Sequence, residues 1–307
     1  MFQVIFMSYK LKKMFIKKIV MALALNFKRS NTKNTEGLSI MIFSKDRPMQ
    51  LEALLNSIRL CVEGEYQLIV QWSTSSTIYD EAYHKVLDVY KDIIFKNNRE
   101  KNFRNDLLRN LNEFKFSKLM FLVDDIIFTN NFKTAWLKGI DLKKVVPSIR
   151  LWSGINYTQP SDSINPPPKI NSFYVKPWFS FSWVESGGYW SMPLAVDGNI
   201  FDKKEILFLL KHSSFKAPNT LEKALGPYRF LFKYRKGICL DKPLIINFAL
   251  NRVNIENSDF ECGDEYSSEK LLELWNNGKK IDLKAMQTIK SNSCHIICTP
   301  KFMDTNN

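Results

Sequence analysis

The sequence is poor in cysteine and histidine, with five cysteines and three histidines among 307 residues. The cysteines are odd in number and scattered, which argues against a disulfide framework and for a reducing, cytoplasmic environment. Cys294, His295 and Cys298 lie close together in the chain, but they lack the second ligand pair that a structural zinc site needs. We therefore expect buried free thiols, and we assign no chemistry to His84 or His212.

An apolar run long enough to span a membrane is missing from the start of the chain. Within the basic leader, residues 1–36, the apolar run Ile19–Leu25 is too short to cross a bilayer. The residues after this run make a poor cleavage site for a signal peptide. Three interpretations stay open: a basic amphipathic helix on anionic lipid at the inner face of a membrane, an unstructured leader, or translation that starts at Met14 or Met21.

The chain also lacks RGG tracts, RS tracts and aromatic-interleaved RNA motifs, so we expect no nucleic-acid partner. Positive charge is nevertheless in excess, because 44 lysines and arginines against 31 acidic residues give a net charge of +13. This balance suits an anionic membrane face or a phosphate-bearing substrate, and a lysine-rich composition bias explains it equally well. Apolar residues make up 45% of the chain, which is enough for a sizeable core.

What the sequence does contain is a regular alternation of strand and helix patterns from residue 38 to residue 123. Short apolar runs bounded by turn residues predict strands, and apolar residues three or four positions apart predict helices. The alternation predicts βαβ units and a mostly parallel sheet. The predicted strands are Leu38–Phe43, Gln67–Trp72, Ile93–Phe95 and Leu119–Val123, and the predicted helices are Met49–Leu60, Ala82–Val89, Asn102–Phe114, Asp202–Leu210 and Tyr266–Trp275.

Two adjacent aspartates, Asp124 and Asp125, directly follow the apolar run Leu119–Val123. In an open α/β sheet, ligands bind beyond the carboxyl ends of the strands. Two carboxylates at that place suit a hard divalent cation that also holds phosphate oxygens. If the strand continued through them, the two side chains would point in opposite directions, one toward a ribose and the other toward the cation. A simple turn is the alternative.

The order of several motifs resembles the family 2 glycosyltransferases of the GT-A fold. Residues 43–47 (Phe-Ser-Lys-Asp-Arg) stand where that family has Pro-Thr-x-Asn-Arg after its first strand. Residues 103–105 (Phe-Arg-Asn) match its Ala-Arg-Asn, and residues 123–126 (Val-Asp-Asp-Ile) match its metal motif, Asp-x-Asp. The match to the metal motif is incomplete, because one of its two usual carboxylate positions is not filled.

The resemblance continues downstream and covers roughly residues 38–225. Residues 197–205 (Asp-Gly-Asn-Ile-Phe-Asp-Lys-Lys-Glu) are similar to the family's Gly-Gly-Asn-x-x-Phe-Arg-Arg-Glu. The family places an acidic pair about 20 residues later, and residues 218–222 (Pro-Asn-Thr-Leu-Glu) lie at that distance with a single carboxylate. The same five residues have a plain alternative as the start of a helix, with Asn219 or Thr220 as its N-cap.

The resemblance implies roles for particular residues. Asp124 and Asp125 would hold a Mn²⁺ or Mg²⁺ ion, and Glu222 or Asp197 would take the proton of the acceptor hydroxyl. The family usually has an acidic base-reading residue where this chain has Gln71, so the nucleotide base stays open. The implied donor-binding residues are Ser44, Asp46, Arg47, Gln71, Trp72, Arg104, Asn105 and Asp124.

Residues 152–192 are rich in aromatic and turn residues and poor in regular periodicity. Long ordered loops of this kind are usually functional, and acceptor sugars stack on aromatic faces. We therefore predict an acceptor site, and the alternative is a mixed-sheet extension that uses its aromatic residues as core. The predicted acceptor-binding residues are Trp178, Trp183, Tyr189 and Trp190.

These observations predict an α/β protein with a GT-A fold and a mixed extension on the acceptor side. We expect a catalytic domain over residues 37–262, with a nucleotide-sugar half (37–140) and an acceptor half (141–262), followed by a helical extension over 263–307. The predicted function is metal-dependent transfer from a UDP- or GDP-linked sugar to a glycan or glycolipid. One alternative is a nucleotidyltransferase, although residues 43–48 lack the glycine of that class. The other is an inactive relative that binds membranes or polyanions.

Overall fold

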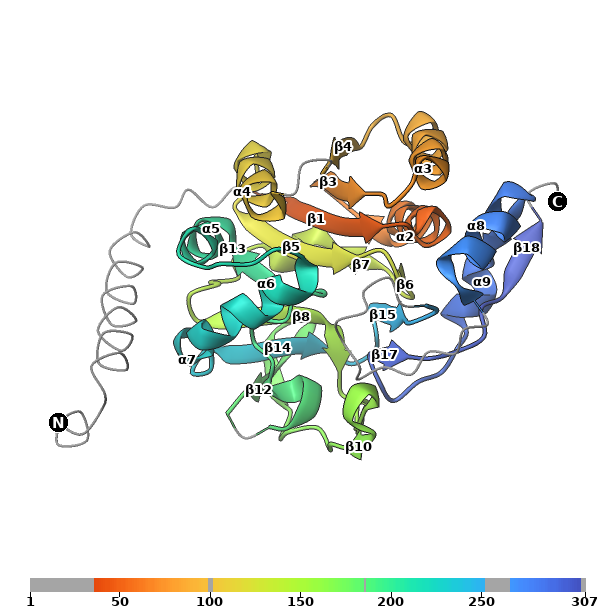
Figure 1. Cartoon of the computed structure of the whole chain (residues 1–307). Coiled ribbons are helices and arrows are strands. Elements are labelled where there is room, and N and C mark those ends of the chain that lie inside the picture. The colour runs from red at the N-terminus through yellow and green to blue at the C-terminus, as the bar shows by residue number, and fades with distance from the viewer. Residues whose placement is uncertain (1–35, 99–101, 185, 252–265, 305–307) are drawn as a thin grey trace, which may run out of the picture.

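The computed structural model describes residues 36–98, 102–184, 186–251 and 266–304, so residues 1–35 of the predicted leader lie outside the described part. A five-stranded sheet forms the centre of the molecule (Figure 1). Its strands, in spatial order, are β13 (Ile200–Asp202), β5 (Lys118–Val123), β1 (Leu38–Lys45), β3 (Tyr66–Ser73) and β4 (Ile94–Asn97). All neighbours pair in parallel except β13, which is antiparallel to β5. The predicted α/β fold with a mostly parallel sheet is confirmed.

Both faces of the central sheet are buried, and the alternation of side chains in β1 separates two cores. Met41 and Phe43 face one core, which contains Leu107 and Leu111 of helix α4. Ile40 and its alternate neighbours face the other core, which contains the apolar stripes of α2 and α3. The helices are α2 (Pro48–Cys61), α3 (Thr77–Val89), α4 (Phe103–Glu113) and α5 (Lys203–Lys211), close to their predicted positions.

A second, mixed sheet combines two strands of the aromatic-rich region with one strand that precedes it and one that follows it. Its strands, in order, are β11 (Asn171–Val175), β12 (Trp178–Ser182), β14 (Lys236–Leu240) and β8 (Val145–Trp152). Only β14 and β8 pair in parallel. Short elements complete this region: β9 (Tyr157–Thr158), β10 (Ser163–Ile164), α6 (Pro218–Leu225) and α7 (Arg229–Phe232).

The C-terminal segment is not purely helical, because it combines α8 (Ser268–Asn276) and α9 (Leu283–Gln287) with three short strands. It packs on α2, where Trp275 Nε1 and Lys280 Nζ both donate to the Glu52 carboxylate at 2.7 Å. It also adds β17 (His295–Ile296) in parallel to β15 (Ile245–Phe248). The remaining strands are β6 (Ile126–Phe128), which pairs with β15, the pair β16 (Lys279–Ile281) and β18 (Phe302–Asp304), and the pair β2 (Val62–Glu63) and β7 (Phe132–Lys133).

The expectation of free thiols is met within the described ranges, whereas the apolar run Ile19–Leu25 lies outside them. Cys61, Cys239, Cys294 and Cys298 are free thiols, and the first three of them are buried. None of the helices in the described part of the chain combines the length and the apolar character that a bilayer crossing requires. The fifth cysteine, Cys262, lies outside the described residues.

Candidate active site

A cavity of about 540 Å³ lies beyond the carboxyl ends of β1, β3 and β5. This is the place where open α/β sheets bind ligands, because the loops that follow the parallel strands all leave the sheet at the same edge. Side chains from α6, β15 and β17 close the cavity from the other half of the molecule. Its charged lining residues are Lys45, Arg47, Asp124, Asp125, Asp197, Lys216, Glu222 and His295.

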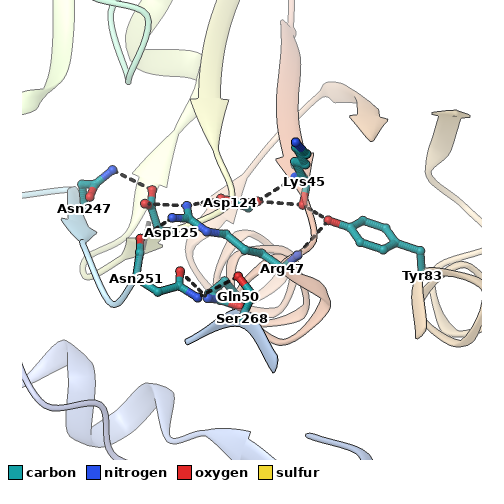
Figure 2. A network of polar contacts seen from close by, with 10 residues as sticks. Lys45, Arg47, Gln50, Tyr83, Asp124, Asp125, Asn247, Asn251 and Ser268 are labelled. Carbon is teal, nitrogen blue, oxygen red and sulfur yellow. Dashed lines mark hydrogen bonds and ion pairs between the residues drawn. The ribbon is translucent and has the colours of Figure 1, made fainter. Parts of the chain in front are cut away.

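Arg47 joins the two strand-end aspartates. Its Nη1 atom donates to Asp124 Oδ1 and to Asp125 Oδ2, each at 3.0 Å, while its Nη2 atom donates to the carbonyl oxygen of Asn251 (Figure 2). The strand β5 ends at Val123, and residues 124–125 form a turn. The strand does not continue through the two aspartates, so the structure has the alternative, a turn, and this turn lets both carboxylates reach one nitrogen.

Each aspartate has further partners that fix its position. Asp124 is 4% exposed, and its Oδ2 atom accepts from Ser44 Oγ at 2.8 Å and from the Lys45 amide at 3.2 Å. Asp125 Oδ1 accepts from Asn247 Nδ2 at 2.7 Å. Burial raises the pKa of Asp124, Arg47 lowers it and the Asp125 charge raises it, with the result at about 6.

The resemblance implies a divalent cation, and the geometry of these two carboxylates fits one. Two carboxylate oxygens converge on the single Arg47 Nη1 atom, which therefore stands at a point that favours positive charge. The described residues hold no cluster of three or more histidine, cysteine or acidic side chains that would form a cage. Magnesium sites commonly use one or two carboxylates and complete their coordination with substrate phosphates and water. A cation at this point requires the Arg47 guanidinium to move away.

A second polar cluster in the same cavity is centred on Asp197. Its Oδ1 atom accepts from Arg150 Nη1, and its Oδ2 atom is 3.1 Å from His295 Nε2. Arg150 is 3% exposed and comes from the middle of β8, while His295 begins β17. Burial alone raises the pKa of Asp197, but Arg150 and His295 lower it by more, so the net shift is downward. Asp197 is consequently an ionised carboxylate at neutral pH.

Glu222 of α6 lines the cavity beside this cluster, and its bonding differs from that of Asp197. Its carboxyl has no hydrogen-bond or ion-pair partner among the described residues. Burial raises its pKa most, the Asp197 charge raises it further, and Arg150 and His295 act in the opposite direction, with the result at about 7. A carboxyl with this pKa exchanges protons near neutral pH, which is the property of an effective general acid or base.

The three other predicted donor contacts near the strand ends are occupied by the protein itself. Gln71 lines the cavity, and its amide oxygen accepts from Asn110 Nδ2 at 3.0 Å while its amide nitrogen donates to the Phe103 carbonyl at 3.4 Å, so both ends of the amide are held by the protein. Trp72 is 2% exposed and stacks on Tyr83 with ring centroids 4.7 Å apart. Asp46 is buried and accepts from the Ser75 amide at 2.7 Å.

Arg104 and Asn105 are not brought to the cavity. Arg104 Nε donates to the Ser213 carbonyl at 2.8 Å, and its Nη2 atom donates to the Lys211 carbonyl at 2.7 Å. It therefore satisfies free carbonyls at the C-terminal end of α5. Asn105 is exposed and accepts from Arg104 Nη1 at 3.3 Å.

The four aromatic residues predicted to bind the acceptor are buried in the cores instead. Trp178 and Trp190 are 0% exposed, Trp183 is 2% exposed and Tyr189 is 4% exposed. None of them lines the cavity, so they have no open face on which a sugar can stack. The alternative interpretation, an extension with an aromatic core, is the one that the structure supports.

Two charged residues of the site were missed by sequence reasoning. His295 was set aside together with Cys294, although it reaches the cavity from the C-terminal segment. Arg150 carried a readable signal, because it is the only charged residue in the strand Val145–Trp152 and all eight positions of that strand are buried. A buried arginine needs an anionic partner, and Asp197 is that partner.

The described structure resembles solved glycosyltransferases. With Staphylococcus aureus TarS residues 1–349, it shares 12% identity at a TM-score of 0.42, over 68% of this chain and 59% of that chain. With a Pyrobaculum calidifontis mannosyltransferase solved with GDP-Man and Mn²⁺, it shares 10% identity at a TM-score of 0.29, over 48% of this chain and 50% of that chain. With the bifunctional glycosyltransferase WbbM, it shares 13% identity at a TM-score of 0.35, over 70% of this chain and 40% of that chain.

These likenesses describe a similar path of the chain and carry no statement about activity. This chain spans less than two thirds of the length of each of the three. No protein-family model and no curated protein sequence matches it. The case for a function therefore rests on the geometry of the cavity.

Proposed function

We propose that the protein is a GT-A-type glycosyltransferase that moves a sugar from a UDP- or GDP-linked donor to a hydroxyl group of a glycan or glycolipid. One observation carries the proposal: a single cavity contains a pair of aspartates that share an arginine and a glutamate whose carboxyl has no such partner. Asp124 and Asp125 face a guanidinium group, which suits a diphosphate with its cation. Glu222 is half-buried and its carboxyl has no bonding partner among the described residues, which suits removal of a proton.

The donor leaves as a nucleoside diphosphate, so negative charge grows on the phosphates during transfer. Lys45, Arg47 and Lys216 line the cavity and supply positive charge to that group. Asp124 and Asp125 would hold a Mn²⁺ or Mg²⁺ ion, which neutralises charge on the leaving diphosphate when it is bound. Arg47, once it leaves the carboxylates, is available to bind the phosphates directly.

Glu222 serves as the proton acceptor in this proposal. The acceptor oxygen forms a bond to the anomeric carbon while the bond from that carbon to the diphosphate breaks, and the hydroxyl proton passes to Glu222. Its pKa of about 7 keeps a substantial ionised fraction at neutral pH and gives the carboxylate a useful proton affinity. Asp197 is less suited to this role, because both of its oxygens are already bonded.

Binding and turnover test the proposal in sequence. Calorimetry with UDP and GDP, each with and without Mn²⁺, should show tighter nucleotide binding when the ion is present. A panel of UDP- and GDP-sugars should then include at least one from which the protein releases the nucleoside diphosphate. Asp125→Asn should remove the effect of Mn²⁺, and Asp92→Asn is the matched control, because Asp92 pairs with Arg59 on an exposed surface.

The other outcomes separate the alternatives. Equal nucleotide affinity with and without Mn²⁺ argues against the cation. Release of pyrophosphate from a nucleoside triphosphate and a sugar phosphate points to a nucleotidyltransferase. Nucleotide binding without turnover of any donor points to an inactive binding module, and absence of nucleotide binding contradicts the proposal as a whole.

A further inference from the structure

The Asp197 cluster contains a histidine that the proposed chemistry has not yet used. His295 Nε2 contacts Asp197 Oδ2 at 3.1 Å, and its Nδ1 atom is 3.6 Å from the Cys294 sulfur. The ring lies against Tyr189, with centroids 5.1 Å apart and planes inclined by 35°. The side chain is 17% exposed, so only a small part of the ring faces the cavity.

The backbone of His295 is fixed as firmly as its ring. β17 pairs in parallel with β15, and His295 is in register with Asn247, the residue that donates to Asp125. In the same ladder, the Asn247 amide donates to the Cys294 carbonyl at 2.9 Å. One short pair of strands therefore connects the C-terminal segment to both acidic groups of the cavity.

Arg150 and His295 share the task of neutralising Asp197. Arg150 takes one carboxylate oxygen and also donates to Cys294 Sγ at 3.4 Å, and His295 takes the other oxygen. Burial alone lowers the pKa of His295, but the Cys294 sulfur and the Asp197 carboxylate raise it above 6.5. Glu222 thus has two cationic side chains and one carboxylate as its charged neighbours in this cluster, with Lys216 on the rim of the same cavity.

We infer that His295 is a positioning residue for the transfer step: together with Arg150 it keeps Asp197 ionised and fully bonded, so that Glu222 is the one carboxyl of the pair that accepts the acceptor's proton. This inference rests on the proposed function and deepens it. It also assigns the C-terminal segment to the active site, because His295 belongs to that segment. The positive charge of His295 favours the ionised form of Glu222 at neutral pH.

Two measurements on the full-length protein test this inference. The first is proton NMR of the three histidines, with the His295 signal assigned from its loss in His295→Gln. In the wild type it should titrate well above 6.5, and in Asp197→Asn it should move down toward that value. Titration of His295 near 6.5 in the wild type overturns the inference, because the imidazole would then be neutral beside Glu222.

The second measurement is the pH dependence of kcat/KM for release of UDP or GDP from the nucleotide sugar and acceptor that the wild type uses. His295→Gln keeps a hydrogen-bond donor but removes the charge. Its acidic limb should therefore shift upward by about half a pH unit or more, while the high-pH plateau and the donor KM stay within about threefold. His212→Gln is the matched control, because His212 is exposed and its ring contacts only the carbonyl and the ring of Phe208 among the contacts described, away from the cavity.

The kinetic outcomes separate the two proposals. A His295→Gln profile that superimposes on the wild-type profile overturns the inference and leaves the proposed function intact. An unchanged acidic limb with a lower plateau and a lower melting temperature shows a merely structural role and also overturns it. If the wild type releases UDP or GDP from no nucleotide sugar in the presence of glycan and glycolipid acceptors, the proposed function fails, and the role of His295 in transfer fails with it.

Discussion

The cavity contains two pairs of carboxyl groups, Asp124 with Asp125 and Asp197 with Glu222, and the two pairs differ in how they share their cationic partners. Asp124 and Asp125 share one arginine, so both are neutralised in part and neither is neutralised fully. Asp197 takes both cationic partners of its pair, Arg150 and His295, and Glu222 takes none. The first arrangement keeps two carboxylates facing one point, which suits a cation. The second separates an ion-pair anchor from a proton acceptor.

The comparison shows how the role of a carboxyl follows from its partners and not from its residue type. Burial raises the pKa of Asp124 and of Glu222, yet Arg47 limits the shift of Asp124 to about 6, while Glu222 reaches about 7. Partial burial raises the pKa of Asp197 as well, and its two cationic partners reverse the shift. Pairs of titratable groups whose environments move their pKa values apart are candidates for acid–base chemistry.

The largest expected effect comes from removing the proton acceptor. Glu222→Gln should lower kcat by about 10²–10⁴-fold, because a general base contributes a factor of that size. UDP affinity should barely change, since the amide keeps the shape of the side chain. Steady-state kinetics and calorimetry measure the two quantities, and Glu273→Gln, on the exposed surface of α8, is the control.

The same assay on Asp197→Asn decides whether the two carboxyls of the second pair differ as described. We expect a smaller loss of kcat than in Glu222→Gln, accompanied by a lower melting temperature, because Arg150 loses its anionic partner. The interpretation is contradicted if Asp197→Asn abolishes turnover while Glu222→Gln turns over normally. The two residues would then have exchanged roles.

The pair of Asp124 and Asp125 is tested by removing the guanidinium group of Arg47, which both carboxylates share. Arg47→Met should weaken UDP binding by about 10–100-fold, because charge-assisted hydrogen bonds contribute about 1.5–3 kcal/mol. The same change should tighten Mn²⁺ binding in the absence of nucleotide, since the two carboxylates lose the competing guanidinium. Calorimetry measures both effects, and Arg59→Met, at an exposed ion pair, is the control. Weaker Mn²⁺ binding in Arg47→Met would show that the guanidinium does not occupy the place of the ion.

The smallest effect concerns stability. The pKa of Glu222 is raised from 4.5 to about 7 in the folded protein, so folding favours its protonated form, and stability is lost as pH rises through about 7. Glu222→Gln removes this cost. It should therefore raise the melting temperature at pH 8.5 by a few degrees, for a gain of about 1–2 kcal/mol, and change it little at pH 4.5. An equal change in melting temperature at both pH values would contradict the raised pKa of Glu222.

The sequence predicted the central sheet well, because its strands are short apolar runs between amphipathic helices. The predicted helix Asn102–Phe114 is α4 (Phe103–Glu113), and the predicted strand Leu119–Val123 is β5 (Lys118–Val123). The roles of single side chains were harder to predict. Arg104 lies one residue into a correctly predicted helix, yet it binds carbonyls of α5, a helix about a hundred residues away. Helical periodicity predicts that Arg104 lies in a helix, but it does not predict which distant residues the side chain contacts.

The aromatic region and the C-terminal segment also contain residues whose roles could not be predicted from the local sequence. Trp178 and Trp190 are as compatible with a sugar-binding surface as with a core, and only the packing of the mixed sheet places them at 0% exposure. His295 carries no pattern that marks it as part of an active site. It reaches the cavity because β17 pairs with β15, and this pairing joins segments almost fifty residues apart.

The sequence by itself determined the class of fold and the position of Asp124 and Asp125 at the end of a buried strand, because both follow from local periodicity. The tertiary structure decided how the carboxyls are partnered: Arg47 between two aspartates, Arg150 and His295 on Asp197, and no partner for Glu222 among the described residues. The physical reason is that charge and proton affinity depend on neighbours brought together from distant strands and on the water that they exclude, and neither is encoded within a short window of the chain.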